Sequence, residues 1–394
     1  MTLLVAMLAF VTPGLALAHI ALKSSVPSKG AHLATAPRAL RLTFTEAPEL
    51  TFTRIELIGP DGTPVNLDEL RAAADSPMVI VVRIASALTA GAYTVRWQIA
   101  GKDGHPVRGR FVFTIAPGAQ GLGADRIIAP APSEVGATIT NPGQTPPGAV
   151  HHDPVTMPES EGFDSESALY VFIRWLTFMG ILLLVGVVTF HHVVLGFLRR
   201  KQNPDSPMLS AASSRAAMVG MWGAAALGIV ALLRLYAQSL AMHGGQQAFG
   251  GGLIASMLGK TVWGWGWLLQ VVAVLGAVLA FRAARRGSTA GWSFAAISAV
   301  ILAFTPALSG HASSAPRLTL LAVLADGVHV IGASGWLGSL LIVLVVGIPA
   351  AMQLAEGERG AAVAEVINAY SPTALVFAGI AAATGVFAAW LHIG

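Results

Sequence analysis

The chain has 394 residues, of which 54% are hydrophobic and only 11% are charged, and its formal net charge is +4. Soluble domains carry about 25% charged residues, so this composition excludes a protein that faces water throughout. The sequence contains no cysteine, which excludes disulfides, thiolate metal sites and thiol catalysis. Basic residues gather at the ends of apolar runs instead of forming a patch, and no nucleotide-binding motif is present, so neither a nucleic acid nor a nucleotide is expected as a partner.

The first apolar segment predicts a secreted N-terminus. Residues 1–18 end in Ala16-Leu17-Ala18, the small-x-small pattern behind which signal peptidase cuts. Removal of this signal peptide would make His19 the first residue of the mature protein, in the periplasm. The alternative, an additional membrane helix, is disfavoured because the run is short and is followed by polar residues.

Residues 19–116 predict a small all-β domain. Short apolar or alternating stretches, "ALRLTFTEAP", "FTRIELIGPDG", "MVIVVRI", "GAYTVRWQIAG" and "GRFVFTIAPG", are separated by turns rich in Pro, Gly and Asp. This pattern is typical of a sandwich or barrel of Greek-key, cupredoxin-like or immunoglobulin-like type, with Trp97 and Phe111 in its core. Residues 117–165, rich in Pro, Gly, Ser and Thr, predict a flexible linker. Its His151 and His152 are interpreted as chance histidines, with metal binding as the alternative.

Residues 166–394 predict an α-helical membrane bundle, because a membrane span needs about 20 consecutive apolar residues. Six spans are expected, at about 167–197, 214–240, 261–281, 290–308, 317–348 and 372–394. Basic residues between the first two spans and between the third and fourth spans predict that these loops are cytoplasmic. The β-domain then lies outside, in agreement with the signal peptide, and the protein is expected in the bacterial inner membrane.

His19, Asp103 and His105 predict a metal site on the external domain. After cleavage, His19 offers both its α-amine and an imidazole nitrogen, and the two can chelate one ion. Asp103 and His105 flank Gly104 in "AGKDGHPVRGRF", and side chains two residues apart in an extended segment point the same way. Three nitrogens and one oxygen favour Cu(II), with zinc as the alternative. Taken alone, the Asp-Gly dipeptide also fits a plain hairpin turn.

The similarity of three segments to a known protein family agrees with this predicted metal site. "HIALKSSVPSKGAHL", "LRLTFTEAPE" and "WQIAGKDGHPVRGRFVFTI" resemble the periplasmic copper-binding CopC family. The resemblance implies that His19, Asp103 and His105 bind Cu(II), with Glu46 as a weaker or outer partner. Some members carry a methionine-rich loop for Cu(I), which the segment "IGPDGTPVNLD" does not match.

The membrane segments contain further candidate ligands. Asp326 and His329 are three residues apart in the fifth span, hence on one helix face, and ionisable residues inside a span are functional candidates. His311 is expected at the outer mouth of the fourth span. Together they predict a ladder for a cation, Cu(I) or Cu(II), moving inward. The alternatives are an interfacial loop residue for His311 and a structural interhelical hydrogen bond for Asp326 and His329.

"SGHA" and "ADGVHVIGASGWLG" resemble the CopD membrane family, which occurs fused behind CopC in some bacteria. The resemblance covers about 166–394 and implies copper movement across the inner membrane, usually inward. It also implies further helices after the sixth span, which the printed sequence does not include.

The function expected from these patterns is copper binding and translocation for copper homeostasis and resistance, without enzymatic activity. Other periplasmic copper carriers are possible partners, besides copper and the lipid bilayer. One alternative is a copper sensor or sequestering protein. A second is a membrane oxidoreductase holding haem between His243, His311, His329 or His392. Met242 with His243 is the best of the weaker sulfur-containing candidates, and His191 and His192 are interpreted as interfacial side chains.

Overall fold

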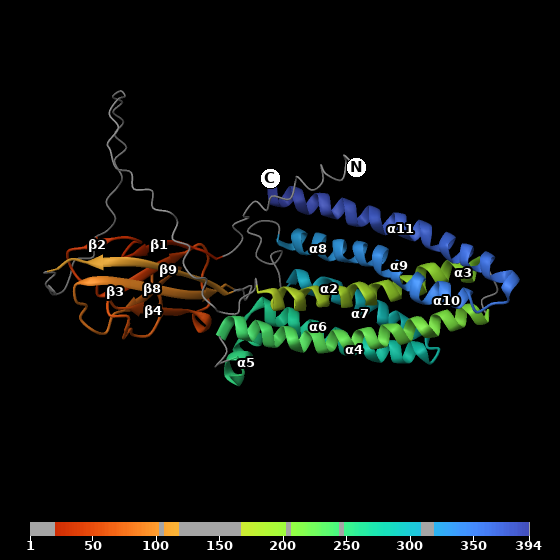
Figure 1. Cartoon of the computed structure of the whole chain (residues 1–394), viewed down its shortest axis with the longest axis horizontal. Coiled ribbons are helices and arrows are strands. Elements are labelled where there is room, and N and C mark those ends of the chain that lie inside the picture. Colours follow the sequence, from red (N-terminus) through yellow and green to blue (C-terminus); the bar gives the residue numbers. More distant parts are fainter. Residues whose placement is uncertain are drawn as a thin grey trace, which may run out of the picture.

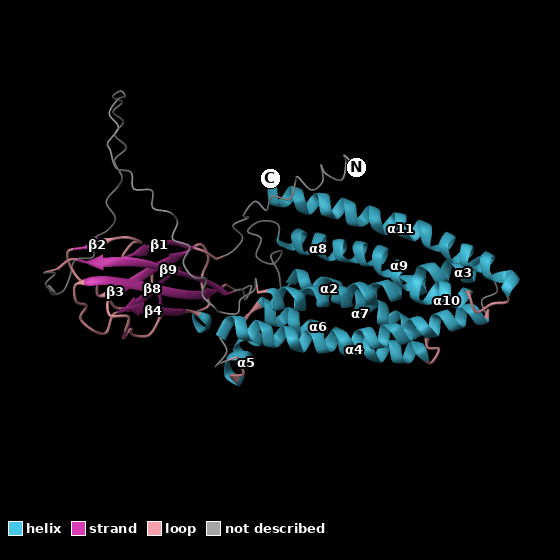
Figure 2. Cartoon of the chain, in the orientation of Figure 1, coloured by secondary structure: helices cyan, strands magenta, loops and turns pink. Residues whose placement is uncertain are grey.

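The computed structural model describes residues 20–101, 106–117, 167–201, 206–243, 248–308 and 319–393. Within these ranges a β-domain is followed by a bundle of long helices, and the two lie end to end (Figure 1). The strands lie in one body and the long helices in the other (Figure 2). The predicted fold class, an all-β domain followed by a helical membrane bundle, is therefore confirmed.

Within the described residues, nine strands build the β-domain. Their bounds are β1 Leu22–Val26, β2 His32–Leu33, β3 Ala39–Phe44, β4 Arg54–Ile58, β5 Pro64–Val65, β6 Arg71–Ala73, β7 Ser76–Arg83, β8 Gly91–Ala100 and β9 Pro106–Ile115, with a 3-10 turn η1 at Leu50–Phe52. One sheet has the order β1-β3-β7-β6 and the other has the order β2-β9-β8-β4-β5. Strands β2 and β9 run parallel, and the other pairs are antiparallel. The domain is thus a two-sheet sandwich.

Buried and more exposed side chains alternate along the longer strands, and the buried ones form a single core between the two sheets. On β3 the buried side chains are Leu40, Leu42 and Phe44, and Phe44 meets Trp97 of β8 edge to face at 5.6 Å. Phe111 of β9 is buried in the same core, so both predicted core aromatics are confirmed. Strands β3, β4, β7, β8 and β9 coincide with the five predicted stretches. Of the other four strands, β2, β5 and β6 have only two or three residues, and β1 has five but does not alternate regularly between buried and exposed side chains.

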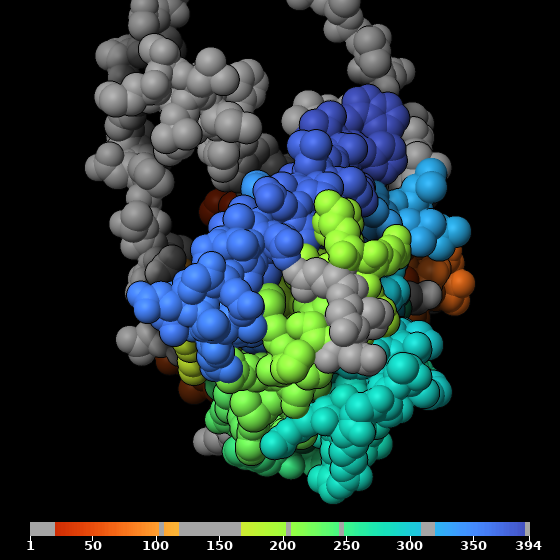
Figure 3. Space-filling model, turned by 90° about the vertical axis from the view of Figure 1, so that its right-hand side faces the viewer, coloured from red at the N-terminus to blue at the C-terminus, as the bar shows by residue number. Residues whose placement is uncertain are grey.

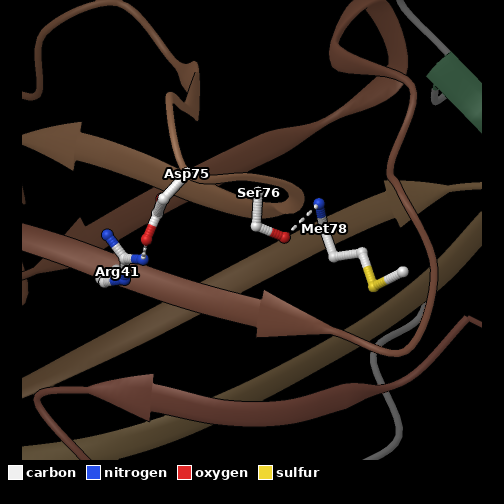
Figure 4. A network of polar contacts seen from close by, with 4 residues as sticks. All are labelled: Arg41, Asp75, Ser76 and Met78. Atoms are coloured by element: carbon white, nitrogen blue, oxygen red, sulfur yellow. Dashed lines mark hydrogen bonds and ion pairs between the residues drawn. The ribbon is translucent and has the colours of Figure 1, made fainter. Parts of the chain in front are cut away.

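An exposed ion pair ties the β6–β7 turn to β3 (Figure 4). Arg41 Nη2 lies 2.6 Å from Asp75 Oδ2, and the backbone N–H of Met78 donates to Ser76 Oγ at 3.3 Å. The hydrogen bond from Arg41 lowers the pKa of Asp75 below its ordinary value. Because water screens both side chains, this pair orients the turn and contributes little to stability.

The bundle consists of long helices, two of which are interrupted by π-helical segments. The bounds are α2 Ala168–Thr189, η2 Phe190–Leu195, α3 Gly196–Lys201, α4 Pro207–His243, α5 Gly251–Lys260, α6 Val262–Arg285, α7 Thr289–Leu308, α8 Thr319–Ala333, η4 Ser334–Gly338, α9 Ser339–Ile342, η5 Val343–Gly347, α10 Ile348–Ala351 and α11 Glu356–Ile393. Helices α2 to α3 and α8 to α10 each form one continuous rod. Figure 3, which views the bundle end-on, shows green residues of the early helices between the blue C-terminal helix and the teal residues around α7.

Six of these helical segments in the described residues are long and apolar enough to cross a membrane. They extend over Ala168–Lys201, Pro207–His243, Val262–Arg285, Thr289–Leu308, Leu320–Ala351 and Glu356–Trp390. The number of predicted spans is confirmed, and four of the first five match the predicted ranges within a few residues, whereas the second begins earlier than predicted, at Pro207 instead of 214. The sixth predicted span, about 372–394, falls in α11, which begins earlier, at Glu356, and continues through Pro372. Hydropathy alone does not detect the polar first turns of this helix, which carry Glu356 and Glu358.

Candidate metal-binding sites

The structure describes only part of the predicted ligand set. His19, Asp103, His105 and His311 lie outside the described residues, as do the linker histidines. Glu46 is exposed in the bend that follows β3. Within the part of the chain that the structure describes, no three histidine, aspartate or glutamate side chains come together in a group suited to an ion.

The chain next to His19 is held beside the bend that carries Glu46. The backbone N–H of Ala21 donates to Thr45 Oγ1 at 2.9 Å, and the N–H of Thr45 donates to the carbonyl of Ala21 at 2.9 Å. Ile20, which directly follows His19, is buried in the sandwich core. The described residues thus bring Ile20 and Ala21, which follow His19, next to the end of β3.

The chain on both sides of Asp103 and His105 reaches the same place. Ala100 at the end of β8 pairs with Pro106 at the start of β9. The backbone N–H of Glu49, three residues after Glu46, donates to the carbonyl of Ala100 at 3.0 Å. The described neighbours of all the predicted external ligands therefore meet at one end of the sandwich.

This end of the sandwich contacts the bundle through the last turn of α4 (Figure 1). Gln98 Nε2 donates to the carbonyl of Met242 at 2.6 Å, and Arg108 Nη2 donates to the carbonyl of Ala241 at 2.8 Å. Arg108 Nε also donates to Gln98 Oε1 at 2.9 Å, which holds the two donors together. The last carbonyls of a helix have no partner within the helix, so these side chains cap α4 from the β-domain.

Apolar side chains complete this contact, which we call the junction. The members of its buried cluster are Phe52 and Ala100 from the β-domain and Met242, Met257, Trp263 and Trp267 from α4, α5 and α6. The cluster is separate from the sandwich core and from the core of the bundle. Helix α5, which the sequence did not predict, contributes Met257 to the junction.

Replacing Arg108 by alanine should loosen the last turn of α4. A hydrogen bond from a charged donor contributes about 1.5–3 kcal/mol, which corresponds to local opening roughly tenfold more frequent or more. Hydrogen–deuterium exchange over residues 238–243 measures this effect in the full chain. Arg110→Ala is the control, because Arg110 is exposed on the same face of β9. Equal exchange in the two variants would show that Arg108 does not hold the junction.

In the fifth span, His329 is anchored to α11 through one ring nitrogen. His329 Nδ1 lies 3.0 Å from the carbonyl oxygen of Ala381 and 3.1 Å from Thr384 Oγ1, both on α11. A carbonyl only accepts, so Nδ1 carries the hydrogen and the neutral ring keeps its lone pair on Nε2. Metal-binding histidines are usually oriented by such a hydrogen bond from the other nitrogen.

Asp326 lies one helical turn before His329 on α8, and both side chains are half-buried. The predicted shared helix face agrees with the α-helical geometry of Thr319–Ala333. Helix α8 packs against α7 and α11, and a Cβ at Gly327 would lie 2.2 Å from the ring of Phe304. The carboxylate and the imidazole are thus carried by a closely packed helix.

His191, toward the end of the bundle that lies away from the β-domain, is not free to bind a metal. It is buried, its ring stacks on Trp292 with centroids 3.6 Å apart, and its Nδ1 lies 3.1 Å from Ser213 Oγ. Its Nε2 lies 3.4 Å from Arg199 Nη1, a donor that occupies the lone pair. The interpretation of His191 as an interfacial side chain is therefore wrong, because ring stacking holds it inside the bundle.

Arg234, which the sequence patterns did not single out, is buried in the second span. Arg234 Nη1 donates to Gln270 Oε1 at 2.9 Å, and its guanidinium lies over the Trp263 ring at 5.4 Å. The sequence could nevertheless have indicated Arg234 as a candidate, because a charged residue inside an apolar membrane segment is often functional. Its contacts connect α4 and α6 just beneath the junction cluster that contains Trp263.

Comparison with known proteins supports this two-part organisation. Residues 22–116 match the CopC domain family, and residues 164–316 match the family of copper resistance protein D-like N-terminal domains. The chain is 26% identical over 334 residues to the copper transport protein CutJ of Bacillus subtilis, covering 83% of this chain and 53% of CutJ. It therefore spans about half the length of that relative.

The β-domain has relatives that consist of little else. Copper resistance protein C of Pseudomonas syringae pv. tomato is 33% identical over 106 residues, which are 26% of this chain and 83% of that protein. Among solved structures, PcoC, a copper resistance protein from Escherichia coli, is 30% identical, with 24% of this chain and 99% of that one covered and a TM-score of 0.23. CopC from Methylosinus trichosporium OB3b is 27% identical, with 26% and 98% covered and a TM-score of 0.24. The chain belongs to the copper resistance family as a fusion of a CopC domain with a CopD-like membrane domain.

Proposed function

We propose that the protein captures Cu(II) outside the membrane and moves copper inward through the helix bundle. The external ligands are His19, Asp103 and His105, with Glu46 as a weaker partner. The observation that carries this proposal is that the described neighbours of these residues meet at the end of the sandwich that contacts the bundle. Copper bound there would need to travel only a short way to enter the membrane domain.

The chemistry of the four residues suits Cu(II). The α-amine of a mature N-terminal His19 has a pKa of about 7.7–8, so a metal displaces its proton at little cost. One amine, two imidazoles and a carboxylate supply the nitrogen and oxygen atoms that Cu(II) prefers, and divalent copper binds more tightly than zinc at equal availability. This ligand set requires signal peptide cleavage behind Ala18.

The distribution of charge supports an orientation with the β-domain in the periplasm. Basic residues follow the helices at the end of the bundle away from the β-domain; they are Arg199, Arg200, Lys201, Arg282, Arg285 and Arg286. Cytoplasmic loops are enriched in such residues. We therefore place that end in the cytoplasm and the protein in the inner membrane of a bacterium.

Within the bundle, His311, Asp326 and His329 form the proposed path. His329 supports this role because Nδ1 is anchored to α11, which leaves Nε2 as the nitrogen that carries the lone pair. The relative CutJ is named a copper transport protein, which is in line with movement of the ion rather than storage alone. The proposed function needs no bond-forming chemistry on a substrate.

The external site is tested by Cu(II) titration of the isolated 19–116 domain, followed by electron paramagnetic resonance. A domain of this size is a separate protein in PcoC, 99% of which is covered by the match. His19→Ala, or one extra residue before His19, should weaken Cu(II) binding by about 100-fold or more, because even outer-shell partners contribute 10–100-fold. His32→Ala is the control, since His32 lies exposed in β2. Unchanged spectra and affinity with an extra N-terminal residue would remove the amine from the site.

A further inference from the structure

His243 is the last residue of α4 and lies buried in the junction. Its side chain is only 5% exposed, and its ring centroid lies 5.9 Å from that of Phe52 in the β-domain. It is thus covered by the β-domain from one side and by helices from the other. A polar ring at such a place needs partners for both of its nitrogens.

The hydrogen bonds around His243 determine which nitrogen carries the hydrogen. Ser239 Oγ donates its single hydrogen to the carbonyl of Ala248 at 2.7 Å. The same hydroxyl lies 3.2 Å from His243 Nδ1, so in that contact it accepts, and Nδ1 must be the donor. The neutral ring therefore carries its lone pair on Nε2.

His243 Nε2 is buried and has no hydrogen-bond partner in the described structure. Other buried side-chain nitrogens without a partner there include those of Trp97, Trp263 and Gln270. Those three are N–H donors and cannot bind a cation, whereas Nε2 of His243 is a Lewis base. A buried lone pair beside a ring anchored through Nδ1 is the arrangement that a metal-binding histidine requires.

The junction beside His243 also contains two soft donors. Met242 is 2% exposed and Met257 is fully buried, and both belong to the junction cluster that contains Phe52. Thioether sulfur selects Cu(I) among the ions available to such a site. Arg54 lies close enough for its charge to act on His243, and this repulsion disfavours a divalent ion more than a monovalent one.

We propose that His243 Nε2, with the thioether sulfurs of Met242 and Met257, forms a binding site for Cu(I) at the junction. The site is distinct from the external Cu(II) site, and it does not depend on the N-terminal amine. It lies where α4, α5 and the β-domain meet, so its occupation links the two domains. The proposal concerns binding of an ion supplied as Cu(I) and includes no electron transfer.

The test is Cu(I) binding to the full-length protein in detergent, under anaerobic conditions, in competition with a chromophoric Cu(I) chelator. His243→Phe keeps an aromatic ring against Phe52 but removes the lone pair, and Met257→Leu conserves volume but removes the sulfur. Each variant should weaken Cu(I) binding at least tenfold. His192→Asn and Met218→Leu are the controls, because both side chains are exposed on the bundle and should leave the affinity unchanged.

Two further measurements separate this site from the external one. An extra residue before His19 should leave Cu(I) binding intact, and X-ray absorption of the Cu(I)-loaded protein should show sulfur as well as nitrogen neighbours. Wild-type affinity in His243→Phe, or a copper environment without sulfur, would overturn the proposal. Loss of Cu(I) binding on extending the N-terminus would also overturn it, because the ion would then be held by the external ligands.

Discussion

Replacing Gly186 by leucine is expected to prevent correct assembly of the helix bundle. A Cβ at Gly186 would lie 2.2 Å from the backbone carbonyl carbon of Gly338, and a Cβ at Gly338 would lie 2.1 Å from the carbonyl oxygen of Leu182. The backbones of α2 and η4 are thus in direct contact, and neither can move as a side chain would. Overpacking of side chains lowers the free energy of unfolding by about 1–3 kcal/mol, and separating two helix backbones should lower it by more.

The measurement is the yield and thermal unfolding of the full-length protein in detergent. Gly196→Ala is the matched control, because Gly196 follows in the same helical rod and a Cβ there would meet nothing within 4 Å. That substitution should leave stability unchanged or raise it by up to about 1 kcal/mol through helix propensity. Gly186→Leu protein as stable as Gly196→Ala protein would contradict the close contact between α2 and η4.

Replacing His329 by leucine is expected to abolish most copper accumulation in cells. The substitution removes the Nε2 lone pair, which is the feature of His329 that a moving copper ion would use. It also removes the hydrogen bonds to Ala381 and Thr384, so the contact of α8 with α11 must be controlled separately. Loss of a metal ligand should lower accumulation at least tenfold, in line with the 10–100-fold effect of outer-shell partners.

Two substitutions at Thr384 provide that control. Thr384→Ser keeps a hydroxyl that can accept from Nδ1, and it should accumulate copper as the wild type does. Thr384→Val removes one of the two acceptors but leaves the carbonyl of Ala381, so an intermediate loss is expected. Accumulation is measured as cellular copper at matched membrane levels of each variant. Normal accumulation in His329→Leu would reject transport through this residue and favour a protein that only sequesters copper.

Several features of the fold were predictable from local patterns. The alternation of apolar and polar residues in "ALRLTF" and "GAYTVRWQIA" predicts β3 and β8, because every second side chain of a strand faces the core. The spans were predictable because a bilayer needs about 20 apolar residues, a length that the sequence displays directly. Asp326 and His329 could be assigned to one helix face because their spacing is a property of the α-helix alone. The family, too, is visible in short motifs.

By itself, then, the sequence determined the two domains, the number of spans and the residue types available for copper. Only the tertiary structure decided which residues from distant parts of the chain meet. The contact of Gln98 and Arg108 with the end of α4, and of Phe52 with His243, joins segments more than a hundred residues apart. No repeating pattern in a short stretch of sequence predicts such contacts, because they depend on how whole surfaces pack together. Which nitrogen of His329 carries the hydrogen was decided in the same way, since its acceptors on Ala381 and Thr384 lie on another helix, 52 and 55 residues further along the chain.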